Sequence, residues 1–335
     1  MTIKDLAAIT GYAVGTVSRA LNDHPNVSDT ARKAILRAAK EHGFQLNENA
    51  KQLKQSHSNN ILVIIKGTGN EFFAEMLECI QNLIAHTRYQ LVVDYLDEDL
   101  NEVNRAVQLC REKKPRGILF LGGSSRNLSA DFDKIDIPCV EVTNDASALS
   151  FPNLSSVTTD DREAARRAID TLVCSGHRKI AVIGGDKTSS DISRLRLEGC
   201  QQSFREHGIS FDPQRDYRGV RFSCEDGYNA TRSLLNGGDY TAIFAFSDLM
   251  AIGALRALWE AGRRVPEDVS IMGLDGLALG KYLVPQLSTV RQDFRTIAQR
   301  SVEILLSAVE EGIPARHETV PFEIQPRESI RTISR

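Results

Sequence analysis

Apolar residues in the N-terminal segment of this chain repeat every three to four positions, which is the period of an amphipathic α-helix. In the first predicted helix, Thr2 is a candidate N-cap with Asp5 three residues later, and Leu6 and Ile9 form the apolar stripe. Gly11 follows the last periodic residue, where helices commonly end in the left-handed conformation. The pattern predicts a short, capped helix that ends in a tight turn.

A second helix is predicted from Val14 to Leu21, with Val17 and Leu21 turned inward. Its opposite face carries the small and polar residues Gly15, Thr16, Ser18 and Arg19. Two short helices joined by a tight turn are typical of a helix-turn-helix, whose second helix enters the DNA major groove. A structural helical hairpin has the same periodicity, so the spacing alone leaves both interpretations open.

A third helix is predicted from about Ser28, a candidate cap, to His42, before Gly43. Its buried stripe consists of Ala31, Ile35, Ala38 and Ala39. Three helices can share a small core, although a domain of this size is only marginally stable alone. The third helix favours the DNA-reading interpretation.

From Ile61 onward, short strand-like runs alternate with helical segments, and the alternation starts again after Thr158. Strands are predicted at residues 61–66, 89–96, 117–123, 137–142, 179–185, 240–246 and 268–276, with a last one near 320–324. Helices are predicted at residues 72–86, 103–113, 161–176, 196–208, 227–238 and 247–262. This order predicts two doubly wound parallel-sheet halves with a cleft between them, and ligands bind such folds beyond the carboxyl ends of the strands.

Candidate ligand groups stand at the ends of these predicted strands. The residues predicted to bind an effector are Phe73, Thr143, Asn144, Arg196, Phe222, Ser247, Asp275 and Gln292. Arg196 is expected between a strand and the start of the next helix, and Phe73 or Phe222 could serve as an aromatic platform. Arg and Asp side chains beside an aromatic ring suit a polyhydroxylated ligand. Two simpler interpretations stay open, namely that Asp248 only caps its helix and that Phe72 is a core residue.

A polar segment, residues 47–60, separates the helical head from the first strand. Asn47 to Lys54 can form two helical turns, too short to be stable without a partner, and residues 55–60 form a flexible joint. Leu53 is its one large apolar side chain, of the kind that wedges between base steps in a minor groove. A frayed linker is the alternative interpretation.

Charge is unevenly distributed along the 335 residues. The formal net charge is −3, but residues 1–60 hold 8 Lys and Arg against 5 Asp and Glu, whereas the rest hold 33 against 39. A basic head on an acidic body suits a chain whose N-terminal part alone contacts phosphate.

The six cysteines form no CxxC pair, so free thiols in small core positions are expected rather than disulfides or a zinc site. No apolar run approaches the ~20 residues that a membrane span needs, and no signal peptide precedes the head. We expect a cytoplasmic protein of two or three domains, with neither a cofactor nor a metal.

The segments TIKDLAAITGYAVGTVSRALN and NVSDTARKAILRAAKEHGF closely resemble the head of LacI/GalR-family transcriptional regulators. Further along, SGHRKIAVIGG, RLRLEG, TAIFAFSDLMAIGALRAL, GRRVPEDVSIMGLDG and PQLSTVRQDF match the regulatory body of that family. The resemblance implies a periplasmic-binding-protein-like core that holds a small effector, usually a sugar or nucleoside. It also implies a homodimer or tetramer on double-stranded, pseudo-palindromic operator DNA.

Position by position, the resemblance implies that Val14, Gly15 and Arg19 read base edges, while Thr16 and Ser18 contact phosphate or anchor the helix. It places Leu53 in the minor groove with Ala50 and Lys51 beside it, and the candidate DNA contacts also include Thr2 and Asn22. In the cleft it implies effector contacts for Arg196, Phe222, Asp275 and Gln292, with Ser247 where the family usually has Asn.

The chain departs from the family pattern at three further places. Leu46 replaces the proline before the hinge, Thr143–Asn144 replaces the usual Asp-Arg pair, and Gly276 replaces a second Asp after Asp275. The last two changes remove charged effector contacts, so the sequence names no particular sugar.

The expected domains are a helix-turn-helix domain at 1–46, a hinge and linker at 47–60, and an effector-binding and dimerisation domain at 61–335. The last is expected to divide into residues 61–159 with 291–319, and residues 160–290 with 320–331. The alternatives are an α/β enzyme or a sugar-binding protein with an appended head. Against an enzyme, no GxGxxG opens a helix after the first strand and no P-loop occurs. We expect a homodimer, because no heptad tail that would build a tetramer follows the last predicted strand.

Overall fold

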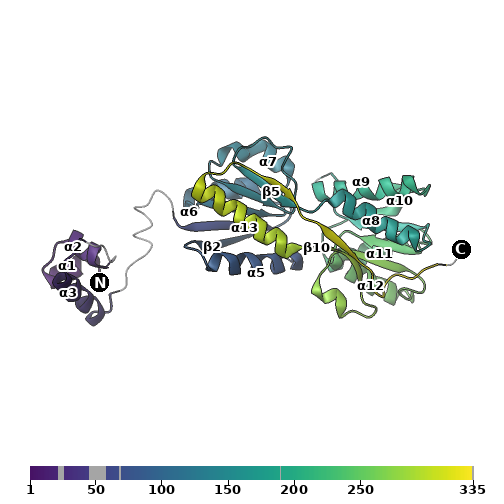
Figure 1. Cartoon of the computed structure of the whole chain (residues 1–335). Helices are drawn as coiled ribbons and strands as arrows, with labels where there is room; N and C mark the ends of the chain where they lie inside the picture. Colours follow the sequence, from purple (N-terminus) through teal and green to yellow (C-terminus); the bar gives the residue numbers. More distant parts are fainter. Residues whose placement is uncertain (22–25, 45–57, 68, 189, 334–335) are drawn as a thin grey trace. The chain divides into compact units, whose positions relative to one another are not determined.

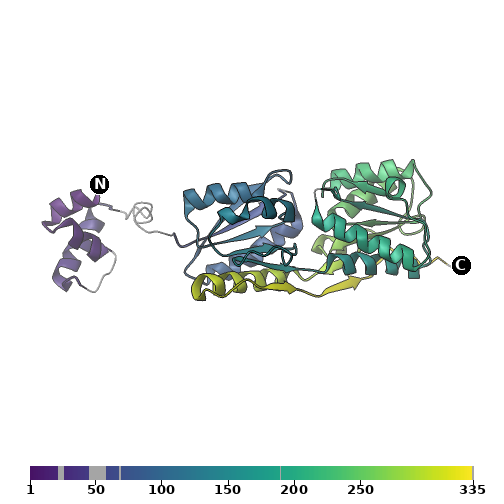
Figure 2. The ribbon, with the colours of Figure 1, turned by 90° about the horizontal axis from the view of Figure 1, so that it is seen from above.

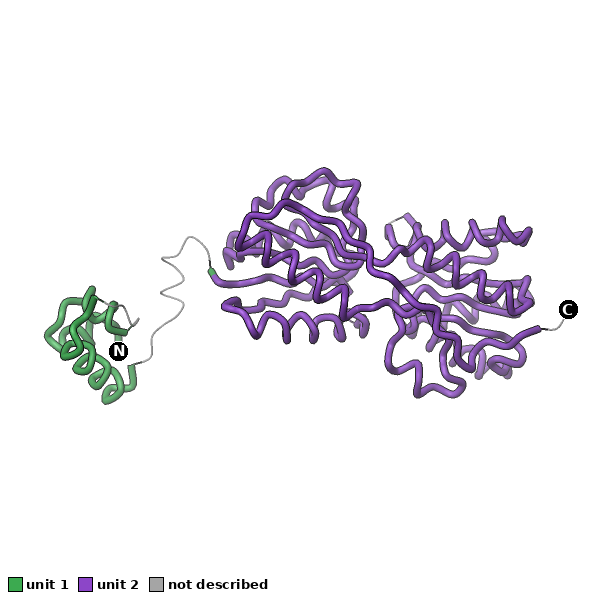
Figure 3. The backbone as a smooth tube through the Cα atoms, viewed as in Figure 1, with its two compact units in different colours: residues 1–58 green, residues 59–335 purple. Residues whose placement is uncertain are grey.

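The computed structural model describes residues 1–21, 26–44, 58–67, 69–188 and 190–333. The chain divides into two compact units, residues 1–58 and residues 59–335 (Figure 3).

The described residues of unit 1 contain three helices, α1 (Ile3–Thr10), α2 (Val14–Leu21) and α3 (Asp29–Glu41), as predicted. The backbone N–H of Asp5 donates to the Thr2 hydroxyl at 3.3 Å, and the Thr2 N–H donates to the Asp5 carboxylate at 2.7 Å, which completes a capping box. Gly11 has a φ of 71° and its N–H donates to the Ala7 carbonyl, so the predicted left-handed end of α1 is confirmed.

The core of unit 1 is built from the side chains of Leu6, Val17 and Ile35, all fully buried. The prediction that Ile9 belongs to this core is wrong, because its side chain is 50% exposed. The buried stripe of α1 follows Ile3, Leu6 and Ala7, with Ile9 beside it. A bundle of three short helices covers only a narrow stripe of each.

Unit 2 consists of two lobes, each built on a six-stranded sheet (Figure 1). In lobe 1 the sheet order is β11-β5-β4-β3-β1-β2, and all pairs are parallel. Its strands are β1 (Asn60–Lys66), β2 (Gln90–Leu96), β3 (Gly117–Leu121), β4 (Cys139–Val142), β5 (Leu154–Thr158) and β11 (His317–Thr319). Its helices are α5 (Glu71–Ala85), α6 (Glu102–Lys113), α7 (Ser125–Asp131), the 3-10 turn η1 (Phe132–Lys134) and α13 (Phe294–Glu311).

In lobe 2 the sheet order is β12-β10-β9-β8-β6-β7, with β12 antiparallel to β10 and the other pairs parallel. Its strands are β6 (Ile180–Gly184), β7 (Tyr217–Gly219), β8 (Ala242–Ala245), β9 (Ser270–Asp275), β10 (Ser288–Gln292) and β12 (Phe322–Gln325). Its helices are α8 (Asp161–Cys174), α9 (Asp191–Glu206), α10 (Pro213–Asp216), α11 (Cys224–Leu235), α12 (Asp248–Glu260) and the 3-10 turn η2 (Ala278–Lys281).

Strand β1 shows how helices cover both faces of a sheet. Ile61, Val63 and Ile65 pack in the cluster formed with α5 and α13, whereas Leu62 and Ile64 pack in the cluster formed with α6 and α7. Each such side chain contributes about 1.5–3 kcal/mol when fully buried. A parallel strand covered on both faces is a continuous apolar run, which is why the sequence predicts it well.

Three short connections join the lobes, after β5, after β10 and after β11. Two of them lie side by side, since the Val320 N–H donates to the Thr158 carbonyl at 2.7 Å. Helix α13 belongs to lobe 1 although it follows a strand of lobe 2, and Figure 2 shows it running along lobe 1.

The predicted fold class is confirmed, namely a helical head followed by two doubly wound halves. The sequence pattern did not assign β5, β7, β10, β11, α7, α10 or α13. The predicted start of one helix at Arg196 is wrong, because α9 begins at Asp191. Cys139 and Cys200 are buried free thiols as expected, but Cys174 is exposed. No helix among the described residues is long and apolar enough to span a membrane.

Glycines allow two helices of lobe 2 to pack backbone against backbone. A Cβ atom at Gly253 of α12 would lie 1.9 Å from the Cys224 carbonyl oxygen, and one at Gly227 of α11 would lie 2.3 Å from the Met250 carbonyl oxygen. Glycine inside a helix costs about 0.5–1 kcal/mol relative to alanine, and the close approach of the helices explains why it stands there.

We expect Gly253→Ala to lower the free energy of unfolding by about 1–3 kcal/mol or more, because the added methyl group forces α11 and α12 apart. Urea unfolding of the full chain measures this change. The matched control is Gly237→Ala, where the nearest atom to a new Cβ is 3.5 Å away and little change is expected. Equal effects of the two substitutions would contradict the packing argument.

Candidate functional site

In unit 1 the exposed face of α2 is the candidate DNA-reading surface. Val14 is 42% exposed, Gly15 and Arg19 are exposed, and Thr16 and Ser18 are half-buried. The Arg19 Nε donates to the Gly15 carbonyl at 3.1 Å, a bond that uses one of its five N–H donors and aligns the side chain along the helix. A planar guanidinium on such a face can donate two bonds to a guanine edge.

Of the remaining candidate DNA contacts, only Thr2 lies among the described residues. Thr2 lies exposed at the start of α1, where its hydroxyl accepts from Asp5 in the capping box. Asn22, Ala50, Lys51 and Leu53 lie outside the described residues, as do Leu46 and the predicted hinge helix.

In unit 2 a cavity of about 870 Å³ lies between the lobes, where the carboxyl ends of the strands of both sheets meet. Seven of the eight predicted effector residues line it: Phe73, Thr143, Asn144, Arg196, Phe222, Asp275 and Gln292. Ser247 is not among the lining residues, and its buried hydroxyl accepts from the Met250 N–H at 3.2 Å as the N-cap of α12. Phe72 packs in the core of lobe 1, as its alternative interpretation expected, and it also reaches the cavity.

Arg196 forms part of the lobe 2 wall and is almost completely buried. Its Nε donates to the Asp161 carboxylate at 2.7 Å, and its Nη1 donates to the Phe246 carbonyl. The side chain therefore projects from the second turn of α9, not from a loop as predicted, and connects the start of α8 with the end of β8. A buried ion pair with further hydrogen bonds is a rigid element of the wall.

Two residues of the cavity wall have strained backbones. Asp275, the last residue of β9, has a φ of 126°, and Thr143, just after β4, has a φ of 81°. Strain of this kind costs about 1–3 kcal/mol per residue and concentrates at ligand sites. The Gln292 Nε2 donates to Asp275 at 3.0 Å, and burial raises the pKa of Asp275 well above its usual range although Arg196 lowers it.

In the lobe 1 wall a buried network surrounds Glu141. Its Oε1 accepts from the Gly123 N–H at 2.8 Å and from the Asn144 side-chain amide at 3.1 Å. Burial raises the pKa of Glu141 well above its usual range, and the nearby Glu102 raises it further. The Thr143 hydroxyl and the Asn144 Oδ1 are buried without a hydrogen-bond partner. Unpaired buried polar atoms that line a cavity are candidate ligand contacts.

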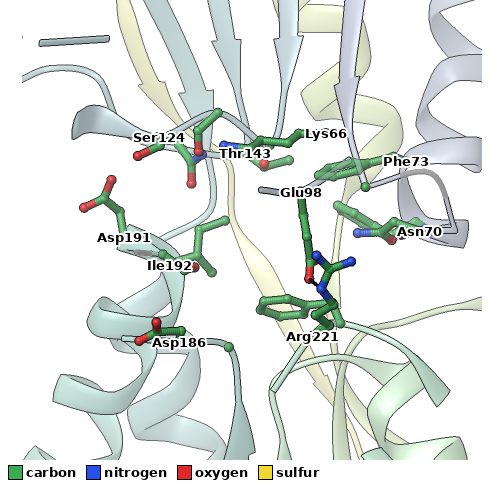
Figure 4. A pocket seen from close by; sticks show the side chains of 18 of the residues that line it. Lys66, Asn70, Phe73, Glu98, Ser124, Thr143, Asp186, Asp191, Ile192 and Arg221 are labelled. Atoms are coloured by element: carbon green, nitrogen blue, oxygen red, sulfur yellow. Dashed lines mark hydrogen bonds and ion pairs between the residues drawn. The ribbon is translucent and has the colours of Figure 1, made fainter. Parts of the chain in front are cut away.

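Ionic contacts join the two lobes at the cavity, and the sequence analysis did not find them. Arg221 of lobe 2 lies 2.9 Å from Glu98 of lobe 1 (Figure 4). It also lies 3.2 Å from Asp97 and contacts Asp99, both of lobe 1. The Ser125 N–H of lobe 1 donates to Asp191 of lobe 2 at 2.9 Å. The signal for these contacts is an acidic run directly after a predicted strand.

The interpretation of Asp248 as a helix cap is wrong. Ser247 caps α12, while the Asp248 carboxylate is fully buried and accepts from the N–H groups of Gly276 and Leu277 at 2.9 and 2.7 Å and from the Thr289 hydroxyl at 2.7 Å. Burial raises its pKa to about 7 against these bonds, which lower it. Asp248 therefore fixes the loop that follows Asp275.

Two family models and a relative of similar length match this chain. Residues 2–47 match the model of bacterial regulatory proteins of the lacI family, and residues 169–330 match a periplasmic binding protein-like domain. The chain is 33% identical to the HTH-type transcriptional regulator MalR of Clostridium butyricum, over 99% of this chain and all of that protein.

Two solved structures share the fold over nearly the whole chain. The lac repressor dimer bound to operator and the anti-inducer ONPF has a TM-score of 0.81 at 26% identity and covers 99% of both chains. The complex of the transcriptional regulator CelR with cellobiose has a TM-score of 0.73 at 26% identity and covers 98% of this chain and 99% of that one.

We expect the buried Asp248 carboxyl to make stability depend on pH. Its pKa is about 7 in the folded protein and near 3.8 when unfolded, so the folded state holds the extra proton between these values. Stability contributed by this group therefore falls as pH rises towards 7, by up to about 1.4 kcal/mol per pH unit, and is constant above it. In Asp248→Asn this dependence should disappear.

Urea unfolding between pH 5 and 8 measures the difference in stability between the original protein and Asp248→Asn. The matched control is Asp268→Asn, whose carboxyl has its pKa lowered to about 2 by Arg264 and does not titrate in that range. A difference between the original protein and Asp248→Asn that stays constant with pH would show that Asp248 does not titrate between pH 5 and 8.

Proposed function

The chain belongs to the LacI family of bacterial regulatory proteins, and from this premise we propose that it represses transcription by binding operator DNA through unit 1 under the control of a small polyhydroxylated effector bound in unit 2. The observation that carries this proposal is the pairing of an exposed α2 face in a helix-turn-helix with a polar cavity between two lobes of one chain. The relatives are transcriptional regulators, which supports a regulatory role for this chain. Such a repressor works in the cytoplasm, where its operator lies.

DNA recognition in this proposal divides between two kinds of contact. Arg19, with Val14 and Gly15 beside it, reads base edges in the major groove, while Thr2, Thr16, Ser18 and Asn22 contact phosphates or hold the helix in register. The hinge residues Ala50, Lys51 and Leu53 contact the minor groove. One head covers few base pairs, so a homodimer on a pseudo-palindromic operator is the functional unit, as in the lac repressor dimer that the chain resembles.

The effector in this proposal is held from both lobes. Arg196, Asp275 and Gln292 supply polar contacts from lobe 2, Thr143 and Asn144 supply them from lobe 1, and Phe73 and Phe222 stack on its apolar faces. A ligand that bridges the lobes stabilises one relative orientation of them. A coupling free energy of about 1–3 kcal/mol between this orientation and the hinge changes operator affinity about 5–150-fold.

We expect Arg19→Ala to weaken binding to a selected operator about tenfold or more, because a bidentate contact to guanine contributes roughly 1–3 kcal/mol of discrimination. Fluorescence anisotropy on a duplex selected from random sequence with the original protein measures this loss. Arg19→Lys should retain non-specific binding and lose specificity.

The matched control is Arg37→Ala, which removes an exposed arginine of the same unit that pairs with Glu41 on α3. Its operator affinity should change little. Equal losses of specific affinity for Arg19→Ala and Arg37→Ala would assign base reading to another part of the head.

We expect Asp275→Asn to bind operator normally and to lose its response to effector, because the carboxylate lies in the cavity wall and in unit 2 only. The measurement is operator affinity with and without the mono- or disaccharide that most raises the melting temperature of the original protein. The control, Asp268→Asn, changes a carboxylate of the same lobe outside the cavity lining and should respond fully. A normal response in Asp275→Asn would remove this residue from the effector site.

A further inference from the structure

The wall of the cavity between the lobes contains more acidic than basic side chains. Its carboxylates are Asp97, Glu98, Asp99, Asp186, Asp191, Asp226 and Asp275, and its basic groups are Lys66, Arg126, Arg196 and Arg221. The acidic groups come from both lobes, and Figure 4 shows Asp186 and Asp191 on one side of the cavity with Glu98 and Arg221 on the other. A ligand in this space meets carboxylates on several sides.

Carboxylates already hold three of the four basic groups. Lys66 donates to the buried Glu102 at 2.9 Å, and Arg196 donates to the buried Asp161 at 2.7 Å. Arg221 is held by the acidic run at 97–99. At Lys66 and Arg196, an anionic ligand would have to displace a buried carboxylate and leave it without its counter-charge, which is costly.

Two partnerless groups in the lobe 1 wall are an amide oxygen, which only accepts, and a hydroxyl, which donates and accepts. The Asn144 amide nitrogen donates to the Gly123 carbonyl, which can only accept, so the orientation of this amide is fixed and its Oδ1 is the free acceptor. The neighbouring Thr143 hydroxyl is likewise buried without a partner. A ligand hydroxyl or ammonium group satisfies the Asn144 oxygen, whereas a phosphate or carboxylate oxygen repels it.

In the lobe 2 wall, the surroundings of Asp275 also disfavour an anionic ligand. Its Oδ1 accepts from the Gln292 amide at 3.0 Å. Burial is the main cause that raises the pKa of its carboxyl, Arg196 lowers this pKa, and Asp248 and Asp161 raise it further. Ligand hydroxyls can exchange hydrogen bonds with this carboxyl in either protonation state, whereas an anion placed beside it opposes its ionisation further.

We propose, building on the effector site above, that the effector is an uncharged or amine-bearing polyol, that is a neutral sugar or an amino sugar, and that the cavity rejects uronates and sugar phosphates. The excess of carboxylates, the pairing of three of the four basic groups and the free Asn144 oxygen all favour ligands that donate hydrogen bonds and carry no negative charge. The acidic run at 97–99, which pairs with Arg221 in the cavity lining, repels anionic ligands from that part of the cavity.

Isothermal titration of the full chain with matched sugar sets tests the proposal at fixed pH and salt. One set is glucose, glucosamine, glucuronate and glucose 6-phosphate, a second is the same series built on galactose, and a third is cellobiose with cellobionate. In any set that binds, the neutral or amino member should bind at least tenfold more tightly than its anionic counterpart. Tighter binding of an anionic member overturns this inference and leaves the proposed repressor function standing.

The absence of binding in every set would refute the carbohydrate effector of the proposed function, and this inference would fall with it. A variant tests the cause of the selection. Glu98→Gln removes one carboxylate and one partner of Arg221, so the preference for the neutral over the anionic member should shrink severalfold. Glu112→Gln, an exposed change on α6 outside the cavity lining, should leave the preference unchanged, and equal behaviour of the two variants would overturn the role of the acidic wall.

Discussion

The cavity of unit 2 depends on one buried guanidinium. Arg196 connects the beginning of α8, the second turn of α9 and the end of β8 through its bonds to Asp161 and Phe246. Because a buried cation is stable only with its partners in place, these three segments keep a fixed relation to one another. Burial raises the pKa of Asp275, and the positive charge of Arg196 lowers it, so Arg196 favours the ionised form of this carboxyl. The lobe 2 wall is therefore organised before any ligand arrives.

The sequence predicts the elements whose signal is local. Strand β1 is a continuous apolar run because helices cover both of its faces, and α2 is found to the residue from its inward stripe. Strand β11, of sequence His-Glu-Thr, is short, polar and partly exposed, and it becomes a strand only because β5 offers a free edge. Helix α13 has a helical period, but nothing local says which lobe it packs against. That choice depends on contacts of α13 with α5, β3, β4 and β5, all of which are distant in the sequence.

The site residues likewise divide into those that the local sequence predicts and those that depend on contacts with distant parts of the chain. Asp275 and Gln292 were found because ligand groups collect at strand ends. Asp248 was misread as a cap, because a carboxylate that follows a strand and a serine has that local pattern, while its partners stand 28 to 41 residues further on. The acidic run at 97–99 reads locally as solvated surface. Its partner Arg221 lies in the other lobe and more than 120 residues away, so only the three-dimensional fold gives it a role.

The crossing of α13 and β11 back into lobe 1 has a consequence for biosynthesis. A ribosome releases β1 to β5 first, but the cluster that contains Ile61 and Val63 also needs Ile297 and Leu305 of α13. The lobe 1 sheet of the nascent chain therefore stays incomplete until nearly all of lobe 2 has been synthesised. Until then one face of the sheet is partly uncovered and the edge of β5 is unpaired. Uncovered faces and open edges invite association with other chains. Chaperone demand during translation is thus concentrated on the lobe that is synthesised first and completed last.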